Sequence, residues 1–259
     1  MSQTRLTLDG LRHYVCNGVH RPLPSVTSIL SATQTEETRK KLQHWTLQNP
    51  GVAEKAAERG SWIHNSVENY IRGLKVIPPK PYEPYWQDMP EKLEELLGDA
   101  KVLWSEKPYN QPKWNQYVGE DGVGRLHYYD DQTDEGYAGC PDIIYKDKNG
   151  EVVLGDFKTS LGPYSTRFPS TKANLPEDLK KALVSGVFKL KKTTLQLAAY
   201  KLAAETCLGV KITKTQIIVS TPVPDFSVQV FTFSESEIEK HTKSWLAIVR
   251  DFYAQLRTT

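Results

Sequence analysis

Two aspartates and a lysine lie beside apolar runs of this chain, and their types suggest metal chemistry. Asp142 precedes the run 143–145, while Asp156 follows the run 152–154 and has Lys158 two residues further on. Carboxylate oxygens bind hard divalent cations, and a bound cation can supply an attacking water beside a phosphate, with a lysine close by. These three residues predict the active site of a metal-dependent nuclease.

The chain between the two aspartates has the pattern of a β-hairpin. Asn149-Gly150 lies between two apolar segments and is a common hairpin turn. Two loops are consistent with this pattern: Asn149 and Gly150 alone, or three residues that begin at Lys148 and place Gly150 in the left-handed conformation. We predict the three-residue loop, between strands at 139–145 and 151–159.

The loop length determines which residues face each other across the hairpin. A two-residue loop would pair Asp142 with Phe157, on the wrong face, whereas the three-residue loop pairs Asp142 with Asp156. Alternation along the second strand then sends Asp156 and Lys158 to the same face. We expect Phe157 and Leu154 to alternate away from that face, with Phe157 in the core.

Two residue pairs on predicted helices could complete a site. His64 and Glu68 are four residues apart and share one helix face, with Gly60 one turn earlier, where a missing side chain would allow close approach. Gln196 and Tyr200 repeat this spacing, and their amide and phenol could reach the acids or a phosphate oxygen. Alone, each pair is more typical of a surface hydrogen bond, so the prediction depends on all the elements occurring together.

A basic segment at 161–192 follows Lys158 directly. The net charge is only +2, so affinity for nucleic acid would have to come from a local patch. This segment carries seven Lys and Arg residues against two acidic ones. A solvated loop and helix would explain it equally well, but adjacency to the carboxylates favours phosphate contacts. The lysines expected to bind nucleic acid are Lys172, Lys180, Lys181, Lys189, Lys191 and Lys192.

The length is compatible with one elaborated domain or two small ones, and we predict one domain that is soluble, intracellular and cytoplasmic. A chain of 259 residues with 39% hydrophobic content can bury a substantial core. No apolar run approaches the roughly 20 residues of a membrane span, and the N-terminus lacks the apolar region of a secretory signal. The three widely spaced cysteines are expected to be reduced thiols rather than zinc or iron–sulfur ligands.

The expected elements alternate between helices and strands, which indicates a mixed α/β sheet with helices packed against it. We place a helical N-terminal lobe at 1–100 and an α/β core at 101–259. A proline-rich loop at 78–90 carries aromatic residues that either pack on the body or offer a surface on which bases stack. The expected helices are 36–49, 52–73, 91–102, 195–207 and 234–256, and the strands besides the hairpin are 103–109, 215–221 and 227–233.

The order of these motifs resembles the RecB-type branch of the PD-(D/E)XK nuclease superfamily. Each occurs once: Arg59-Gly60-X-X-X-His64-X-X-X-Glu68, Gly139-X-Pro141-Asp142, Asp156-Phe157-Lys158-Thr159-Ser160 and Gln196-X-X-X-Tyr200. The stretch Pro24-Ser25-Val26-Thr27-Ser28-Ile29-Leu30 also resembles the N-terminal part of the mitochondrial genome maintenance exonuclease and of phage-encoded relatives. The likeness covers roughly residues 24–200 by scattered motifs and implies a restriction-endonuclease-like fold.

The resemblance also implies roles for individual residues. Lys158 would orient or activate the attacking water, and Gln196 and Tyr200 would steady the site and touch the nucleic-acid backbone. The residues implied as ligands of Mg²⁺, or of Mn²⁺ in its place, are Asp142, Asp156, the carbonyl of Phe157, Glu68 and His64, with Glu106 on the strand at 103–109 as an additional match.

The function implied is a Mg²⁺-dependent deoxyribonuclease, an exonuclease acting on single-stranded DNA or DNA ends in recombination, repair or replication. Two alternatives remain: a DNA-binding accessory protein with little catalysis, and an endonuclease acting on duplex DNA. Some relatives hold an iron–sulfur cluster on four cysteines, and this chain has only three. The stretch between Ser160 and Gln196 is longer than in compact relatives, and we expect it to be an insertion over the active site. Our hypothesis is that it forms a clamp or arch around a single strand, which would favour ends over internal sites.

Overall fold

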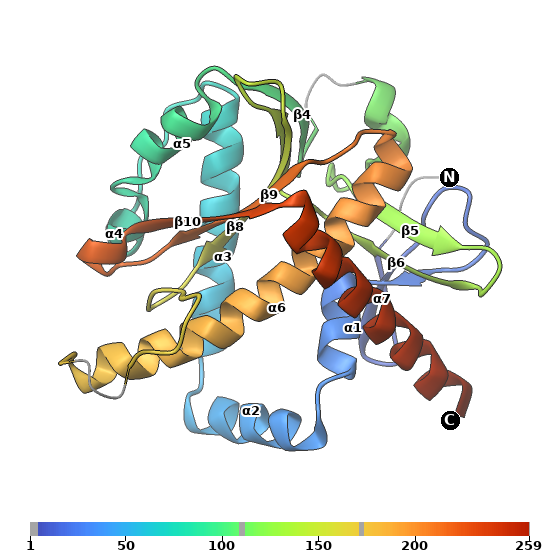
Figure 1. The fold of residues 1–259 in the computed structure, drawn as a ribbon, viewed down its shortest axis with the longest axis horizontal. Helices are drawn as coiled ribbons and strands as arrows, with labels where there is room; N and C mark the ends of the chain where they lie inside the picture. Colours follow the sequence, from blue (N-terminus) through green and yellow to red (C-terminus); the bar gives the residue numbers. More distant parts are fainter. Residues whose placement is uncertain (1–4, 109–111, 171–173, 259) are drawn as a thin grey trace.

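The computed structural model describes residues 5–108, 112–170 and 174–258. Figure 1 shows the arrangement of their helices and strands. The α-helices are α1 (Val26–Ala32), α2 (Glu36–Gln48), α3 (Val52–Ile71), α4 (Glu83–Trp86), α5 (Met89–Leu97), α6 (Glu177–Leu208) and α7 (Glu235–Thr258). The strands are β1 (Arg5–Leu8), β2 (Leu11–Tyr14), β3 (Leu23–Pro24), β4 (Lys101–Ser105), β5 (Leu126–Asp130), β6 (Glu135–Gly139), β7 (Ile143–Lys146), β8 (Val152–Thr159), β9 (Lys214–Ser220) and β10 (Val228–Ser234).

A five-stranded sheet in the order β10-β9-β8-β7-β4 forms the centre of the molecule. Strands β8 and β9 are parallel, and the other neighbours are antiparallel. The long helix α6 connects β8 to β9, as a parallel pair requires a crossover. The expected mixed α/β architecture is therefore confirmed.

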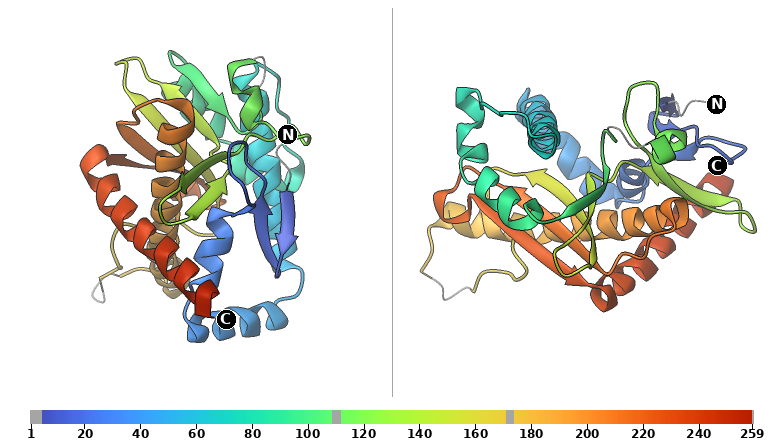
Figure 2. Two further views of the ribbon diagram at one scale, coloured as in Figure 1. Left: turned by 90° about the vertical axis from the view of Figure 1, so that its right-hand side faces the viewer. Right: turned by 90° about the horizontal axis from the view of Figure 1, so that it is seen from above.

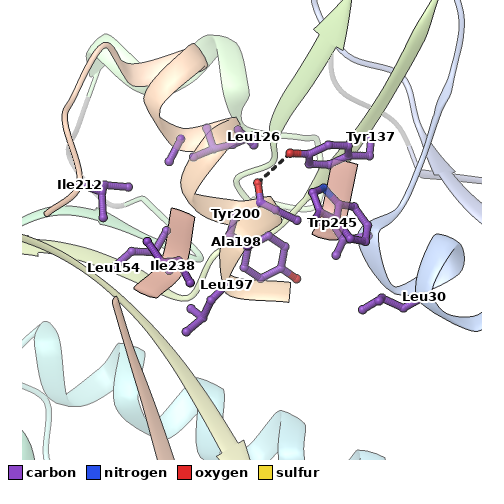
Figure 3. Close-up of a cluster of buried hydrophobic side chains, with 14 of the residues drawn as sticks. Leu30, Leu126, Tyr137, Leu154, Leu197, Ala198, Tyr200, Ile212, Ile238 and Trp245 are labelled. Atoms are coloured by element: carbon purple, nitrogen blue, oxygen red, sulfur yellow. Dashed lines mark hydrogen bonds between the residues drawn. The ribbon is translucent and has the colours of Figure 1, made fainter. Parts of the chain in front are cut away.

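Helices cover both faces of this sheet, as the view from above shows (Figure 2). On one face, α3, α4 and α5 bury an apolar cluster that includes Ile63, Trp86 and Phe157. On the other face, α6 and α7 bury a larger cluster, part of which Figure 3 shows. Each fully buried Leu, Ile or Phe side chain stabilises the fold by about 1.5–3 kcal/mol relative to exposure, so the two clusters fix β7 and β8 between two helical layers.

The hairpin between β7 and β8 has the predicted register. Ile143 pairs with Gly155, and beyond the last ladder pair the Asp147 N–H donates to the carbonyl of Glu151 over 2.9 Å. Gly150 has φ of 83°, the left-handed conformation that the three-residue loop needs. The prediction for Phe157 is confirmed, since it is buried between the sheet and α3.

The prediction for Leu154 was wrong. Leu154 is fully buried in the cluster under α6, and it shares the even-numbered face of β8 with Asp156 and Lys158. The physical reason is the period of two along a strand, which puts residues two and four apart on one face. The face that carries the charged residues therefore begins as part of the apolar core and becomes polar only at the end of β8.

Helix α6 is much longer than the predicted helix at 195–207. It begins at Glu177 and takes up half of the basic segment at 161–192. Gln196 therefore lies on one continuous helix with Lys180, Lys181, Lys189, Lys191 and Lys192. Gly186 lies inside this helix and allows a close contact, since a Cβ at this position would lie 2.2 Å from the carbonyl oxygen of Pro163. The chain after β8 packs directly on α6 at this point.

The N-terminal part of the chain is not purely helical. Strands β1, β2 and β3 form a small antiparallel sheet, and β5 and β6 form a separate hairpin, neither of which was predicted. Strand β4 covers Lys101–Ser105 rather than 103–109, and Tyr109 lies outside the described residues. The aromatic loop packs on the body, since Tyr85 and Trp86 are buried against α3.

None of the helices among the described residues combines the length and the apolar character needed to cross a membrane. All three cysteines are free thiols.

Candidate active site

Asp142 and Asp156 meet where β7 and β8 diverge from their ladder. One oxygen of Asp142, Oδ2, accepts a hydrogen bond of 2.6 Å from the backbone N–H of Phe157, so the carboxylate reaches across to β8. The backbone carbonyl of Asp142 accepts a hydrogen bond of 2.8 Å from the N–H of Glu106. These two bonds bring residues from three chain segments to one place at the end of the sheet.

His64 completes a cluster with two of these acids. Its Nδ1 lies 3.2 Å from Oδ1 of Asp142 and 3.4 Å from Oε2 of Glu106. Ile63 and Val67 bury one face of α3 against the sheet, which holds His64 at the edge of the contact. The ligand atoms of His64, Glu106 and Asp142 all lie within 4.8 Å of one another, close enough to share one metal ion.

Neighbouring charges shift the pKa values of His64 and Asp142 in opposite directions. Burial disfavours the imidazolium form of His64, but the negative charges of Asp142 and Glu106 outweigh it and raise the pKa of His64 to about 10. Burial alone would raise the pKa of Asp142, but His64, Lys158 and the N–H of Phe157 together lower it. Without a metal, a positive imidazolium therefore lies between two carboxylates.

Asp156 and Lys158 form a second charged pair beside this cluster. The Nζ atom of Lys158 makes an ion pair with Oδ2 of Asp156, whose residue is only 1% exposed. Burial, together with the charge of Asp142, raises the pKa of Asp156 to about 6 despite the attraction of Lys158. Burial lowers the pKa of Lys158, but Asp156 and Asp142 outweigh it, and the net shift is upward.

A pocket of about 300 Å³ contains these charged groups. Its floor is formed in part by Tyr200 of α6, whose hydroxyl accepts a hydrogen bond of 2.7 Å from Nε2 of Gln196. Burial raises the pKa of Tyr200 well above its ordinary value, with the charge of Asp156 adding to the shift. Gly139 lies against this ring, because a Cβ there would be 2.3 Å from its Cε1. Gln196 and Tyr200 therefore line the same pocket as the predicted acids Asp142 and Asp156.

Glu68 has a different environment from the one expected. Its Oε1 accepts hydrogen bonds from Nε and Nη2 of Arg72, at 3.1 and 2.8 Å, and from the hydroxyl of Ser105 at 3.1 Å. Within the described part of the chain, Glu68 is not in the cluster of metal-ligating groups, whereas Glu106 is. The structure therefore brings His64, but not Glu68, to the acids of the sheet.

Gly60 was expected to allow close approach of α3 to the site, and this expectation was wrong. A Cβ at Gly60 would meet no atom within 4 Å. Gly60 instead lines an open groove of about 420 Å³ together with His64 and Glu106. The contact between α3 and the sheet is made by apolar side chains one turn further along.

The predicted basic residues are spread along α6. The Nζ atom of Lys189 donates a hydrogen bond of 2.9 Å to the hydroxyl of Ser160, two residues after Lys158, so it lies next to the site. Lys180 is half-buried and Lys181 is exposed. Lys191 and Lys192 are also exposed, and Lys172 lies outside the described residues.

Sequence reasoning missed the arginines of the pocket. Arg5 and Arg12, from the β1–β2 hairpin, line it, as does Arg125, which makes an ion pair with Asp121. Asp9-Gly10 at the tip of this hairpin is a typical type I′ turn, and both residues have positive φ, 48° and 75°. This dipeptide was the signal that could have revealed the hairpin.

No protein-family model matches this chain, and no curated protein sequence has significant similarity to it. The chemistry of the pocket must therefore be argued from the geometry of its own residues.

Proposed function

We propose that this protein is a Mg²⁺-dependent deoxyribonuclease of the RecB-type branch of the PD-(D/E)XK superfamily, acting as an exonuclease on single-stranded DNA or DNA ends. The observation that carries the proposal is the convergence of His64, Glu106 and Asp142 beside the Asp156–Lys158 ion pair, in one pocket. A cluster of acids and a lysine in a cleft is the arrangement expected for metal-assisted phosphodiester hydrolysis.

The donor set fits a hard divalent cation. Asp142, Glu106 and Asp156 offer carboxylate oxygens, which suit Mg²⁺ and Mn²⁺, and the imidazole of His64 is a ligand that transition metals such as Mn²⁺ accept more readily than Mg²⁺ does. The backbone carbonyl of Phe157 is a further candidate ligand. When bound, the cation would neutralise the clustered negative charge, polarise a phosphoryl oxygen and lower the pKa of a water ligand.

The side chains around the acids would orient the reacting groups. Lys158 is held in place by Asp156, and its remaining N–H groups can donate to a water or a phosphate oxygen. Gln196 donates to the hydroxyl of Tyr200, which leaves the phenol O–H free to donate in turn. Tyr200 belongs to the apolar cluster of which Figure 3 shows a part, so close packing holds its ring in place.

The fold supports the same family assignment. Asp142 directly precedes β7 and Asp156 lies within β8, and these are adjacent strands of a mixed sheet that has helices on both faces. We propose that this is a restriction-endonuclease-like core, with β7, β8 and α3 supplying the metal site. The lysines of α6 that continue from Lys189 would contact the phosphate backbone of the DNA.

The decisive test compares wild type with Asp156→Ala on end-labelled single-stranded DNA in Mg²⁺, with chelator as a blank. We expect wild type to degrade the strand and Asp156→Ala to leave it intact. Asp251→Ala, which removes an exposed acid of α7, is a matched control and should cleave at the wild-type rate. Equal degradation by wild type and Asp156→Ala would show that the acids do not catalyse the reaction.

A closed circular single strand and a closed circular duplex test the exonuclease part of the proposal. An enzyme that needs an end leaves both intact and degrades the same DNA after linearisation. Cleavage of the closed duplex would instead identify an endonuclease.

A further inference from the structure

The hairpin formed by β1 and β2 presents two arginines to the active-site pocket. Arg5 pairs with Tyr14 and Thr7 pairs with Arg12 across this hairpin. Residues that face each other across an antiparallel pair share one face of it. Arg5, Arg12 and Tyr14 therefore lie on the same face, and all three line the pocket that contains Asp142 and Lys158.

These two arginines differ from three other cations at or beside the pocket. Lys158, Arg72 and Arg125 each have a carboxylate partner. Among the residues that the structure describes, neither Arg5 nor Arg12 makes an ion pair, and both are exposed. The polar contact of the Arg12 guanidinium is with the neutral phenol of Tyr14.

The arginines are not needed as counter-ions for the acids of the pocket. Asp142 and Glu106 face His64, Asp156 pairs with Lys158, and Asp121 pairs with Arg125. Two open guanidinium groups on one side of such a pocket provide up to ten N–H donors. Their geometry matches the oxygen atoms of a phosphate better than that of any neutral ligand.

Arg12 is also held by the segment that begins α1. The hydroxyl of Ser28 accepts from the Arg12 N–H at 2.9 Å and donates to the Arg12 carbonyl at 3.1 Å, and the same carbonyl accepts from the N–H of Ser25. Ser25 in turn caps α1 by accepting from the N–H of Ser28. The stretch at 24–30 that the sequence singled out thus fixes the backbone of a pocket arginine.

We propose that Arg5 and Arg12 form a second phosphate subsite, which binds a phosphate of the substrate strand other than the one being hydrolysed. This inference rests on the proposed nuclease function and adds the residues that place the strand relative to the metal. The phosphate is either a terminal monoester, which would define the end of the strand, or an internal diester next to the scissile one. Arg5 and Arg12 act as positioning residues in both cases.

The test measures kcat and KM for Arg5→Gln, Arg12→Gln and the double variant. The substrates are one single-stranded oligonucleotide prepared with a 5′-phosphate, with a 3′-phosphate and with neither. We expect KM to rise about tenfold per arginine, the loss of one charge-assisted contact, with kcat within a factor of about two. Arg12→Lys should recover part of the loss, because it restores the charge but not the planar fork.

The salt dependence separates phosphate binding from a structural role. Each phosphate contact to a single strand contributes a slope of about −0.7 in a plot of log affinity against log salt. Each variant should therefore reduce the slope by about that amount, while Arg250→Gln, an exposed arginine of α7, should not change it. A terminal phosphate predicts that wild type prefers one phosphorylated oligonucleotide and that the double variant loses this preference. An internal phosphate predicts equal effects on all three substrates.

Two results would overturn the subsite. One is a double variant whose KM and salt slope match those of Arg250→Gln; the other is a loss of kcat at unchanged KM. In both cases wild type still cleaves, whereas failure of the proposed function would appear as no cleavage by wild type at all.

Discussion

The two sides of the active-site pocket are built in opposite ways. The carboxylate wall (His64, Glu106, Asp142 and Asp156) is composed of groups that already have partners, and its two aspartates are at most 9% exposed. The arginine wall (Arg5 and Arg12) is exposed and makes no ion pair within the described chain. Groups that must hold a cation in fixed geometry are best preorganised by burial, whereas groups that meet a flexible strand are best left open.

Lys158 belongs to the carboxylate wall by position, and its removal should have the largest effect among the changes compared below. We expect Lys158→Ala to lower kcat by at least about a hundredfold, the typical contribution of a positioned catalytic side chain. Binding of single-stranded DNA should change little, because the arginine wall and α6 remain. Single-turnover cleavage and equilibrium binding measure the two effects separately, and Lys243→Ala on exposed α7 is the control. Loss of binding in place of turnover would assign Lys158 to anchoring.

The burial of Asp156 should make the metal-free protein less stable at neutral pH. Its pKa is about 6 when folded against 3.8 as a model group, so the folded state binds this proton more tightly than the unfolded state does. The resulting stability is fully present below about pH 4 and is lost as pH rises through 6. Asp156→Asn removes this loss, which is on the order of 3 kcal/mol at pH 7.5.

Thermal unfolding in chelator from pH 4 to pH 8 measures this effect. The advantage of Asp156→Asn over wild type should be absent near pH 4 and reach a plateau above pH 6. Mg²⁺ should reduce it, because the cation stabilises only the protein that binds it. An equally large advantage for Asp251→Asn, on the exposed face of α7, would contradict a specific role for burial.

Gly139 packs against the ring of Tyr200 in the active-site pocket, whereas Gly60 lines the separate open groove beside His64. We expect Gly139→Ala to destabilise the protein by about 1–3 kcal/mol, the usual cost of overpacking, because its Cβ would overlap the ring of Tyr200. Denaturant unfolding measures the loss. The double variant Gly139→Ala with Tyr200→Leu, which removes the ring, should lose less than the sum of its two single changes. Additive losses would mean that the ring is not the obstacle.

Gly60→Ala should change the free energy of unfolding least, and it should stabilise the protein, whereas Gly139→Ala destabilises it. Its position is inside α3, and an added Cβ would meet open space. Replacing glycine by alanine inside a helix stabilises it by roughly 0.5–1 kcal/mol. The same denaturant series checks this value. Destabilisation would indicate that the groove beside His64 closes more tightly than the structure shows.

Local patterns in the sequence were sufficient for the hairpin that carries the acids. The turn residues and the alternation of apolar side chains together select one register, and the pairing of Ile143 with Gly155 confirms it. Local patterns did not predict the full length of α6, where contacts with a distant part of the chain determine the structure. The helix predicted at 195–207 instead extends from Glu177 to Leu208, and Gly186 lies inside it, where the missing side chain leaves room for Pro163.

The candidate site was predictable to the extent that its residues share a strand or a helix turn. His64 and Glu68 do lie on one helix, but Arg72, one turn further along, competes for Glu68 and withdraws it from the acids. The spacing of His64 and Glu68 in the sequence cannot show whether Glu68 binds Arg72 or joins the acids of the sheet. Arg5 and Arg12 lie more than 100 residues before Asp142 in the chain, so only the folded hairpin brings them to the pocket.

The three-residue turn at 148–150 has a consequence at the opposite end of the hairpin. Deletion of one residue there would exchange Asp156 and Phe157 across the sheet, placing a carboxylate among the apolar side chains under α3 and a phenyl ring beside His64. Surface turns usually tolerate changes of length. Natural variants of the chain should therefore differ in the residues of this turn but keep its length. The number of residues in the turn determines which face of the sheet carries Asp156.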